Sequence, residues 1–359
     1  MKTLLRCIIP ACAWTTSIDQ EITECEKCGN LLDVTYEGQD PSSFKELFAH
    51  RKANPQSIFD KSGVWRFREL LPFALSSPHP EKVLASLDGK EGPTMPFKLT
   101  KVADYVGITP KTFYLQFEGD NPTGSFKDNG MAAAFTHAKM LGKNRVVCAS
   151  TGNTSASMAA FAANELSTMK AFIFIGSGKI AMGKLAQSLE YGAKVIQIQG
   201  DFDDAMQKVL EVSKTENLYV MNSVNPFRLE GQKTIIYRLL EGLNWQVPDW
   251  IVCPGGNLGN SSSFGKALSE LKQLGLIDKL PRIAIINAAG ANTLNLLVNE
   301  QKIKWNSGKP DTQKVNAFFE QMNKENRKAH TLASAIEINR PVNLYKALRV
   351  LEETNGVVT

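Results

Sequence analysis

The distribution of apolar residues along the chain predicts an α/β fold. From Thr112 onward, short apolar segments rich in Val, Ile and Phe alternate with segments whose apolar residues recur with helical period. Strands that alternate with helices in this way form open parallel sheets with helices on both faces. We expect strands at residues 112–118, 145–149, 170–175, 194–199, 218–222, 250–254 and 282–288, and helices at residues 131–141, 154–165, 181–191, 202–216, 228–243 and 258–274.

Other parts of the chain have different patterns. Residues 1–36 are rich in cysteine and end in an alternating, strand-like segment, LLDVTYE. Residues 62–72 are compact and aromatic, and residues 87–97 form a loop rich in glycine and proline. Residues 305–330 are polar and are expected to form helices on the surface.

Composition and charge narrow the classes of function. The 359 residues are 43% hydrophobic and 21% charged, as in an ordinary globular protein, and are enough for two domains. The net charge of +5 is scattered, which argues against a surface for nucleic acid or membrane. No apolar segment is long enough to span a bilayer, and Arg6 interrupts the N-terminal stretch that would otherwise resemble a signal peptide. We therefore expect a cytoplasmic protein.

Four of the six cysteines gather near the N-terminus. Their spacing is C-x4-C, then twelve residues, then C-x2-C followed by glycine. Paired cysteines of this kind predict a closed structural zinc site with four thiolates, or the remnant of one. Disulfides are the competing interpretation, which a reducing cytosol disfavours. The predicted ligands are Cys7, Cys12, Cys25 and Cys28, whereas Cys148 and Cys253 lie in apolar segments and are expected in the core.

A lysine follows the first of several unusual loops. The segment EGDNPTGSFKDNG, residues 118–130, joins a β-prone stretch to an alanine-rich helical one, and Ser125 is placed to cap the helix. Lys127 then lies in or beside the first turn, where a cation opposes the positive end of the helix dipole. This field, with partial burial, would lower the pKa of the lysine and make its amine nucleophilic. A solvated surface lysine is the alternative.

Two further loops open helices at the carboxyl ends of predicted strands, where α/β proteins bind ligands. Residues 150–157, STGNTSAS, offer hydroxyls, an amide and backbone N–H groups, which suit a carboxylate; simple N-capping is the alternative. Residues 254–263, PGGNLGNSSS, hold three glycines in five positions but no P-loop lysine. This second loop suits the phosphate of a small cofactor.

A fourth loop carries an arginine. In residues 222–231, NSVNPFRLEG, Arg228 offers a planar set of donors for a phosphate or carboxylate, with Asn222 and Ser223 beside it. A surface ion pair with Glu230 or Glu241 is the alternative.

Taken together, these loops match the needs of pyridoxal phosphate. Lys127 would form an imine, the glycine loop would bind the 5′-phosphate, and residues 150–157 would bind the α-carboxylate of an amino acid. The Arg228 site implies an amino acid with a second anionic group.

The motifs resemble those of threonine synthase, in the tryptophan-synthase-β (fold type II) group of pyridoxal-phosphate enzymes. The resemblance covers most of the chain and includes SGVWRFRELLP, LDGKEGPT, EGDNPTGSFKDNG, CASTGNTSAS, GKIAMGKLAQSLEYGAKV, NSVNPFRLEGQKT, CPGGNLGN and NRPVNLYKALR. GSFKD and STGNTS occur widely in the fold group, whereas NSVNPFRLEGQKT and GKLAQ look specific to threonine synthase. The implied organisation is a homodimer whose chain has a zinc-ribbon-like segment (1–36), a large domain (37–134 and 227–359) and a small α/β domain (135–226).

The resemblance also implies a role for individual residues. Lys127 matches the Schiff-base lysine that moves the α- and β-protons, Phe126 the residue beside the cofactor ring, and Asn153 the partner of the pyridine 3′-oxygen. The cofactor phosphate would be bound by Gly255, Gly256, Asn257, Leu258, Gly259 and Asn260. The substrate carboxylate would be bound by Ser150, Thr151 and Thr154, and the substrate phosphate by Asn222, Ser223 and Arg228, with Lys184 as a further contributor.

The family reaction converts O-phospho-L-homoserine and water to L-threonine and phosphate. Two alternatives stay open. A threonine or serine dehydratase, or a cysteine-synthase-like enzyme, would share the lysine and asparagine loops but would not need Arg228 with Asn222 and Ser223. A catalytically decayed paralogue would act as a binding module.

Two features depart from the family pattern. Asn129 stands where an arginine is common, and we expect this to be tolerated because the position lies beyond the lysine. The family continues for several tens of residues after the position of Thr359, so the residue that faces the pyridine nitrogen is expected outside this sequence. A chain of this extent is expected to be truncated and to bind the cofactor weakly or be inactive.

Overall fold

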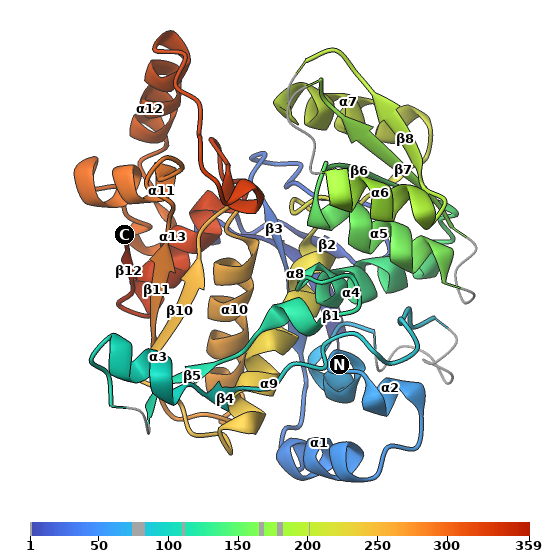
Figure 1. Cartoon of the computed structure of the whole chain (residues 1–359), viewed down its shortest axis with the longest axis vertical. Helices are drawn as coiled ribbons and strands as arrows, with labels where there is room; N and C mark the ends of the chain where they lie inside the picture. Colours follow the sequence, from blue (N-terminus) through green and yellow to red (C-terminus); the bar gives the residue numbers. More distant parts are fainter. Residues whose placement is uncertain (1, 74–82, 110–111, 165–168, 178–181, 201) are drawn as a thin grey trace.

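The computed structural model describes residues 2–73, 83–109, 112–164, 169–177, 182–200 and 202–359 (Figure 1). These residues form one antiparallel sheet of three strands, two parallel sheets and one short strand pair. The predicted helix ends at residues 165 and 181, and residues 178–181 of the GKIAMGKLAQ motif, lie outside the described residues.

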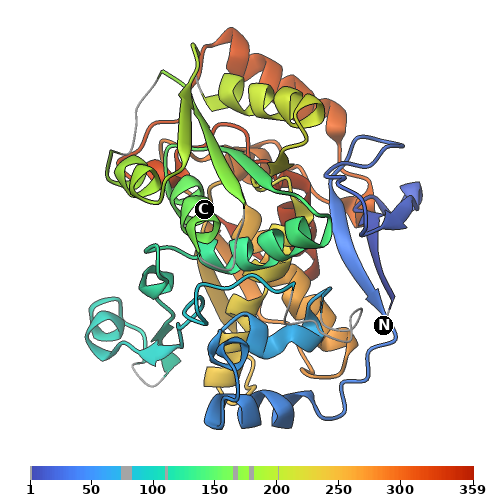
Figure 2. The ribbon, with the colours of Figure 1, turned by 90° about the vertical axis from the view of Figure 1, so that its right-hand side faces the viewer.

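The N-terminal sheet has the strand order β2-β1-β3. Strand β1 (Lys2–Cys7) pairs antiparallel with β2 (Thr15–Ser17) and β3 (Leu32–Glu37), and the 3-10 helix η1 (Pro10–Cys12) follows β1. Leu5 and Val34 face each other in the register and are fully buried, which confirms the strand predicted from LLDVTYE. Figure 2 shows this sheet, in blue, along one side of the molecule.

The central part of the chain forms a parallel sheet in the order β8-β7-β6-β9, with helices on both faces. Val146 and Cys148 of β6 pack with Met158 of α5, whereas Val147 packs with Val209 of α7. Successive side chains of a strand point to opposite faces, so α5 and α7 cover the two sides. The elements are α4 (Lys127–Met140), β6 (Arg145–Ala149), α5 (Asn153–Ala163), β7 (Lys170–Ile175), α6 (Met182–Glu190), β8 (Lys194–Gln197), α7 (Phe202–Thr215) and β9 (Tyr219–Val220).

A second parallel sheet, in the order β10-β11-β12, is built from the last third of the chain. Its inner face packs Ile251 and Ile283 against Leu268 of α10 and Ala347 of α13. On its other face the side chain of Val252 is 64% exposed. The elements are α8 (Pro226–Gln232), α9 (Thr234–Gly242), β10 (Trp250–Pro254), α10 (Gly259–Gln273), β11 (Arg282–Ile286), α13 (Leu344–Glu353) and β12 (Val357–Val358).

The remaining elements are short or lie at the surface. Helix α12 (Thr312–Lys324) confirms the surface helix predicted within residues 305–330, since most of its side chains are exposed. The others are α1 (Phe44–Ala53), α2 (Ile58–Lys61), η2 (Trp65–Leu70), β4 (Phe97–Lys98), α3 (Thr100–Tyr105), β5 (Tyr114–Leu115), η5 (Glu118–Asp120), α11 (Thr293–Asn295), η6 (Leu296–Glu300), η7 (Asn306–Gly308) and η8 (Ser334–Ile336). Within the described ranges, no helix is both long and apolar enough to cross a bilayer.

The prediction of a buried parallel strand at residues 112–118 is wrong. Only Tyr114 and Leu115 are in a strand, β5, which pairs antiparallel with β4 and is exposed. An apolar, β-prone stretch fits an exposed strand pair as well as a buried parallel strand, because composition does not report the number of covered faces. The parallel sheet of the central part begins at β6.

Candidate active site

Lys127 is the first residue of α4, where the loop of residues 118–126 enters the helix. The Ser125 hydroxyl accepts a hydrogen bond from the Lys127 N–H at 3.3 Å, but the N-cap residue is Phe126, one position later than predicted. The Lys127 Nζ lies 3.7 Å from the centre of the Phe126 ring. Burial, and then the charge of Arg228, lower the pKa of Lys127 well below its usual range. This is the direction that a nucleophilic amine requires.

Arg228 lies in α8, with its side chain almost completely removed from solvent. It is 1% exposed, and its Nη1 donates to the carbonyl of Met221 at 2.7 Å. The Nε has no hydrogen-bond partner among the described residues. Burial lowers the pKa of Arg228 to about 10, so the guanidinium stays protonated at neutral pH. A buried cation with an unused donor is well suited to bind an anion.

The carboxylates near Arg228 in sequence pair with other cations. Glu230 lies 2.6 Å from Lys233 and 2.7 Å from Lys266, and Glu241 lies 2.9 Å from Arg66. The alternative interpretation of Arg228 as a member of a surface ion pair is therefore wrong.

Helices α4 and α8 bring Lys127 and Arg228 together through an unusually close contact of their backbones. A Cβ at Gly130 would lie 3.0 Å from the carbonyl oxygen of Arg228, and one at Gly231 would lie 1.9 Å from that of Asn129. Only glycine permits this approach.

The loops after β6 and β9 lie side by side at the carboxyl ends of their strands. The Asn222 amide donates to the Ala149 carbonyl at 2.9 Å and accepts from the Ala149 N–H at 3.0 Å. Asn222 therefore ties its own loop to the start of the Ser150 loop. Helix α5 begins at Asn153, and its N-cap residue Gly152 makes no side-chain cap bond; no other capping side chain is found among the described residues, so the simple capping alternative does not hold.

The glycine loop after β10 is closely packed against Asn287 and Ile336. A Cβ at Gly255 would lie 2.6 Å from the Asn287 amide nitrogen, and one at Gly256 would lie 3.1 Å from Ile336. Leu258 has a left-handed backbone with φ 63°, which aims the chain into the N-terminus of α10 at Gly259. The packing of the protein itself therefore favours glycine at positions 255 and 256, and the phosphate-binding role of the loop stays a prediction.

Three polar residues near the site were missed by the sequence reasoning. Asp128 is fully buried and accepts from the hydroxyls of Thr123 and Ser157, both at 2.6 Å, so it fastens the lysine loop to α5. Gln232 and Asn343 both reach toward Gly259, where a Cβ would lie 3.3 Å from Gln232 Oε1 and 3.8 Å from Asn343 Nδ2. All three lie in motifs that carry the family resemblance, but those motifs alone did not indicate what their side chains contact.

Lys184 of α6 contacts the lysine loop. Its Nζ donates to the carbonyl of Thr123 at 2.7 Å and would lie 3.4 Å from a Cβ at Gly124. The predicted contributor to the substrate phosphate site is thus held beside the loop that leads into Lys127.

The four N-terminal cysteines meet at one place. Their sulfur atoms all lie within 4.8 Å of one another; Cys7 Sγ is 3.4 Å from Cys28 Sγ, and Cys12 Sγ is 3.6 Å from Cys25 Sγ. All four are free thiols. A tetrahedral zinc ion with Zn–S bonds of about 2.3 Å would place its sulfurs about 3.8 Å apart. The donor set fits zinc.

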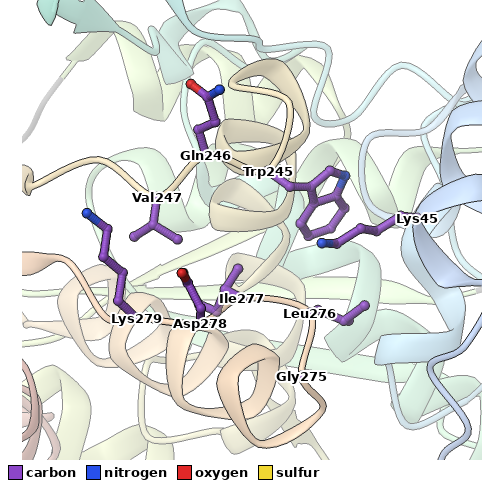
Figure 3. A pocket seen from close by; sticks show the side chains of 9 residues that line it. All are labelled: Lys45, Trp245, Gln246, Val247, Gly275, Leu276, Ile277, Asp278 and Lys279. Atoms are coloured by element: carbon purple, nitrogen blue, oxygen red, sulfur yellow. The ribbon is translucent and has the colours of Figure 1, made fainter.

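A pocket of about 650 Å³ lies elsewhere on the surface (Figure 3). Trp245 and Lys45 face each other in it, with the Lys45 Nζ 5.2 Å from the centre of the Trp245 ring. None of the predicted site residues lines this pocket, so it is separate from the Lys127 site.

The Lys127 site fits pyridoxal phosphate. Around Gly259, three buried acceptors lack partners among the described residues, namely Asn260 Oδ1, Gln232 Oε1 and Asn343 Oδ1. An unpaired buried acceptor costs about 1–3 kcal/mol, so a hydrogen-bond donor, such as a water molecule, is expected beside these atoms. The loop offers backbone N–H groups of a helix N-terminus for a phosphate, and Lys127 offers the amine.

Comparisons with known proteins show the family to which the chain belongs. The family described as pyridoxal-phosphate dependent enzyme matches residues 87–359. Threonine synthase of Methanocaldococcus jannaschii is 40% identical over 355 residues, which cover 98% of this chain and 78% of that protein. Threonine synthase of Methanosarcina acetivorans is 40% identical over 352 residues, which cover 98% of this chain and 76% of that protein.

A solved structure shows the same fold. Threonine synthase from Escherichia coli aligns with a TM-score of 0.61 and 17% identity, covering 99% of this chain and 77% of that chain. Identity of 40% over nearly the whole chain, together with the family match, goes beyond likeness of fold. The chain belongs to the threonine synthase family of pyridoxal-phosphate-dependent enzymes.

Proposed function

We propose that this chain converts O-phospho-L-homoserine and water to L-threonine and phosphate. The observation that carries the proposal is the buried guanidinium of Arg228, whose charge acts on the amine of Lys127. A lysine for proton transfer and a fixed cation for a second anionic group thus lie on facing helices. The names of the relatives support the same reaction.

The cofactor would be held by residues of three elements. Lys127 would bind it covalently, Phe126 would pack beside its ring, Asn153 would face the 3′-oxygen, and the loop Gly255, Gly256, Asn257, Leu258, Gly259 and Asn260 would bind its phosphate. When bound, pyridoxal phosphate supplies a conjugated ring that delocalises the electron pair left on the α-carbon of the substrate.

The substrate would be held at both ends. Ser150, Thr151 and Thr154, at the N-terminus of α5, would bind the α-carboxylate. Ser223 and Arg228 would bind the phosphate, with Lys184 near them and Asn222 fixing the two loops together. Binding at both ends would leave the α- and β-carbons beside Lys127.

The Lys127 amine would then move the protons. Its lowered pKa keeps more of it neutral than in a surface lysine, so it can accept a proton from Cα. It hands this proton on within the site before it accepts the second proton, from Cβ. The bond between Cγ and the phosphate oxygen breaks, and Arg228 neutralises the charge that develops on the departing phosphate. The two protons taken up by Lys127 are returned, one to Cγ and one to Cα. Water gives its hydroxyl to Cβ and its proton to the departing phosphate, which leaves threonine and inorganic phosphate.

The first test is an assay of both products. Purified protein with pyridoxal phosphate and O-phospho-L-homoserine should release phosphate and threonine in equal amounts. Lys127→Ala should abolish both, whereas Lys101→Ala, an exposed lysine on α3, should change neither. Phosphate without threonine would show that elimination proceeds and water addition does not. Neither product, from this chain or from one that also carries the segment expected after Thr359, would contradict the proposal.

A second assay separates this reaction from those of other fold type II enzymes. A dehydratase would release ammonia from threonine or serine, and a sulfhydrylase would act on an activated serine with sulfide. We expect neither activity above 1% of the main one, an order-of-magnitude bound based on the loss of the Arg228–phosphate interaction.

Three further expectations stay predictions. The division into residues 1–36, 37–134 with 227–359, and 135–226 can be tested by limited proteolysis. The homodimer can be tested by sedimentation. The cytoplasmic location can be tested by fractionation.

A further inference from the structure

The segment between α12 and α13 contacts both predicted phosphate-binding loops. In Figure 1 it is the red chain that runs from α12 through the middle of the view to α13. The N–H groups of Val342 and Asn343 donate to the side chain and the carbonyl of Asn257, at 3.3 Å and 3.2 Å. Ile336 lies earlier in the same segment, and its Cγ2 atom would be 3.1 Å from a Cβ at Gly256.

The side chain of Asn343 extends these contacts to the second loop. Its Nδ2 donates to the carbonyl of Ser223 at 3.1 Å and to the carbonyl of Asn257 at 3.4 Å. Asn343 is completely buried, so water does not compete for these bonds. One amide therefore joins the loop after β10 to the loop after β9.

The position of Asn343 in its own helix supports a role outside that helix. It is the N-cap residue of α13, where asparagine usually accepts a hydrogen bond from the first turn. Here no side-chain cap bond is made, and the amide points instead to Ser223 and Asn257. The side chain of Asn343 therefore does not stabilise the N-terminus of α13 by capping, and instead hydrogen-bonds the two loops to each other.

We propose that Asn343 is a positioning residue that fixes the spacing between the site of the cofactor phosphate and the site of the substrate phosphate. The inference rests on the proposed function, because that function assigns a phosphate to each loop. Without the amide, the carbonyls of Ser223 and Asn257 lose a shared buried donor, and each loop is free to shift. Both binding steps then weaken together, although Asn343 itself contacts no reacting atom.

The test uses two substitutions at this position and one control. Asn343→Asp keeps the shape but replaces the donor by an acceptor that repels both carbonyls. Asn343→Ser keeps a good helix N-cap but is too short to bridge the loops. Asn316→Asp, at an exposed asparagine of α12, is the matched control for the change from amide to carboxylate. Melting temperatures are measured for all three.

Three constants are measured for each protein: the Kd of the cofactor, and the KM and kcat of the reaction. Pyridoxal phosphate affinity is followed by absorbance, and KM and kcat are measured with O-phospho-L-homoserine. For both Asn343 variants we expect the cofactor Kd and the KM to rise about tenfold each, as for loss of a buried hydrogen bond, with kcat changed less than about threefold. Asn316→Asp should leave all three constants unchanged.

Three results would overturn the proposal. In the first, the cofactor Kd and the KM both stay within twofold of the unaltered protein; in the second, only one of them changes. In the third, Asn343→Ser restores both constants, which would mean that Asn343 acts as a helix cap. If Asn343→Asp does not fold, Asn343→Ser decides. Failure of the unaltered protein to act on O-phospho-L-homoserine would contradict the proposed function instead. In that case the cofactor Kd, with the Kd of inorganic phosphate for the cofactor-loaded protein in place of KM, still decides the role of Asn343.

Discussion

The amine of Lys127 owes its low pKa to two neighbours of different kinds. Burial acts through the loss of water around the amine, and Arg228 acts through its positive charge. Because the pKa of Arg228 falls only to about 10, its repulsion persists at neutral pH. One guanidinium therefore has two effects: it offers a donor to an anion, and it favours the neutral form of the Lys127 amine.

This double role predicts the effect of removing the charge. Arg228→Gln should raise the pKa of Lys127, whereas Arg228→Lys should leave it nearly unchanged, since the charge remains. The pKa is measured by NMR on cofactor-free protein after reductive methylation with 13C-formaldehyde, and the Lys127→Ala spectrum assigns the signal. Arg228→Lys should still raise the KM for O-phospho-L-homoserine on the order of tenfold, because a lysine lacks the planar pair of donors. An unchanged pKa in Arg228→Gln would contradict this account.

At the scale of elements, the site depends on how closely α4 and α8 approach. The backbone of Gly231 lies against the carbonyl of Asn129, and Gly130 lies against the carbonyl of Arg228. Asn129 also donates to Glu118 at 3.0 Å, and Glu118 in turn contacts the buried Arg238 at 3.1 Å. The asparagine that departs from the family pattern is thus part of a buried polar network behind the lysine loop.

The close contact predicts a large effect from one methyl group. Gly231→Ala should force the two helices apart and destabilise the protein by about 1–3 kcal/mol, with a rise in KM because Arg228 moves relative to Lys127. Gly183→Ala is the control, since a Cβ at this helical position of α6 meets no atom of the described residues within 4 Å. There we expect no loss, or a gain of up to about 1 kcal/mol from helix propensity. Denaturant unfolding and steady-state kinetics measure both effects, and equal behaviour of the two variants would refute the argument.

The sequence predicted features that depend on neighbouring residues, but not contacts between residues far apart in the chain. Lys127 could be found because a cation in the first turn of a helix opposes the helix dipole, and Arg228 because polar residues after an apolar strand mark the binding edge of a parallel sheet. Asn343 could not be assigned, because its partners Ser223 and Asn257 are 120 and 86 positions away, and no local pattern reports such a contact. The strand predicted at residues 112–118 failed for a similar reason, since burial of its faces is decided by distant parts of the chain.

At the scale of the whole molecule, the N-terminal sheet is fastened to the elements that carry the site. Asp33 of β3 pairs with Lys346 at 2.9 Å and with Arg349 at 2.7 Å, and these two cations hold its pKa far below the usual range despite burial. Tyr36 of β3 contacts Glu230 of α8, two residues after Arg228. The N-terminal sheet, seen at the side of the molecule in Figure 2, therefore contacts α8, the helix that carries Arg228.

His137 makes another such link and predicts a pH dependence of stability. It lies in α4, receives a hydrogen bond from the Tyr219 hydroxyl at 2.6 Å, and donates to the Ile18 carbonyl at 2.6 Å. Burial lowers its pKa from 6.5 to about 4; Lys143 also lowers it, and Asp19 opposes the shift.

The unfolded chain therefore binds more protons between these values, and stability is lost as pH falls from about 6.5 to about 4. The loss attributable to His137 is about 3 kcal/mol. Denaturant unfolding from pH 7 to pH 4 should show a shallower pH dependence in His137→Gln than in the unaltered protein. Parallel curves for the two proteins would contradict the assignment.

The cysteine cluster makes the strongest prediction at this scale, because metal binding would hold the whole N-terminal sheet in its docked form. Purified protein should contain one zinc ion per chain, measured by plasma mass spectrometry. Chelation or Cys28→Ser should remove the ion and lower the Tm by about 5 °C or more, since the free energy of metal binding to such sites contributes to folding. Glu26→Gln, an exposed change between Cys25 and Cys28, should keep both the zinc and the Tm. Because Tyr36 contacts Glu230 in the arginine helix, zinc loss should also raise the KM for O-phospho-L-homoserine more than it raises the cofactor Kd. Protein that is purified without zinc at full stability, or that keeps its Tm after chelation, would show that the four thiols serve no metal.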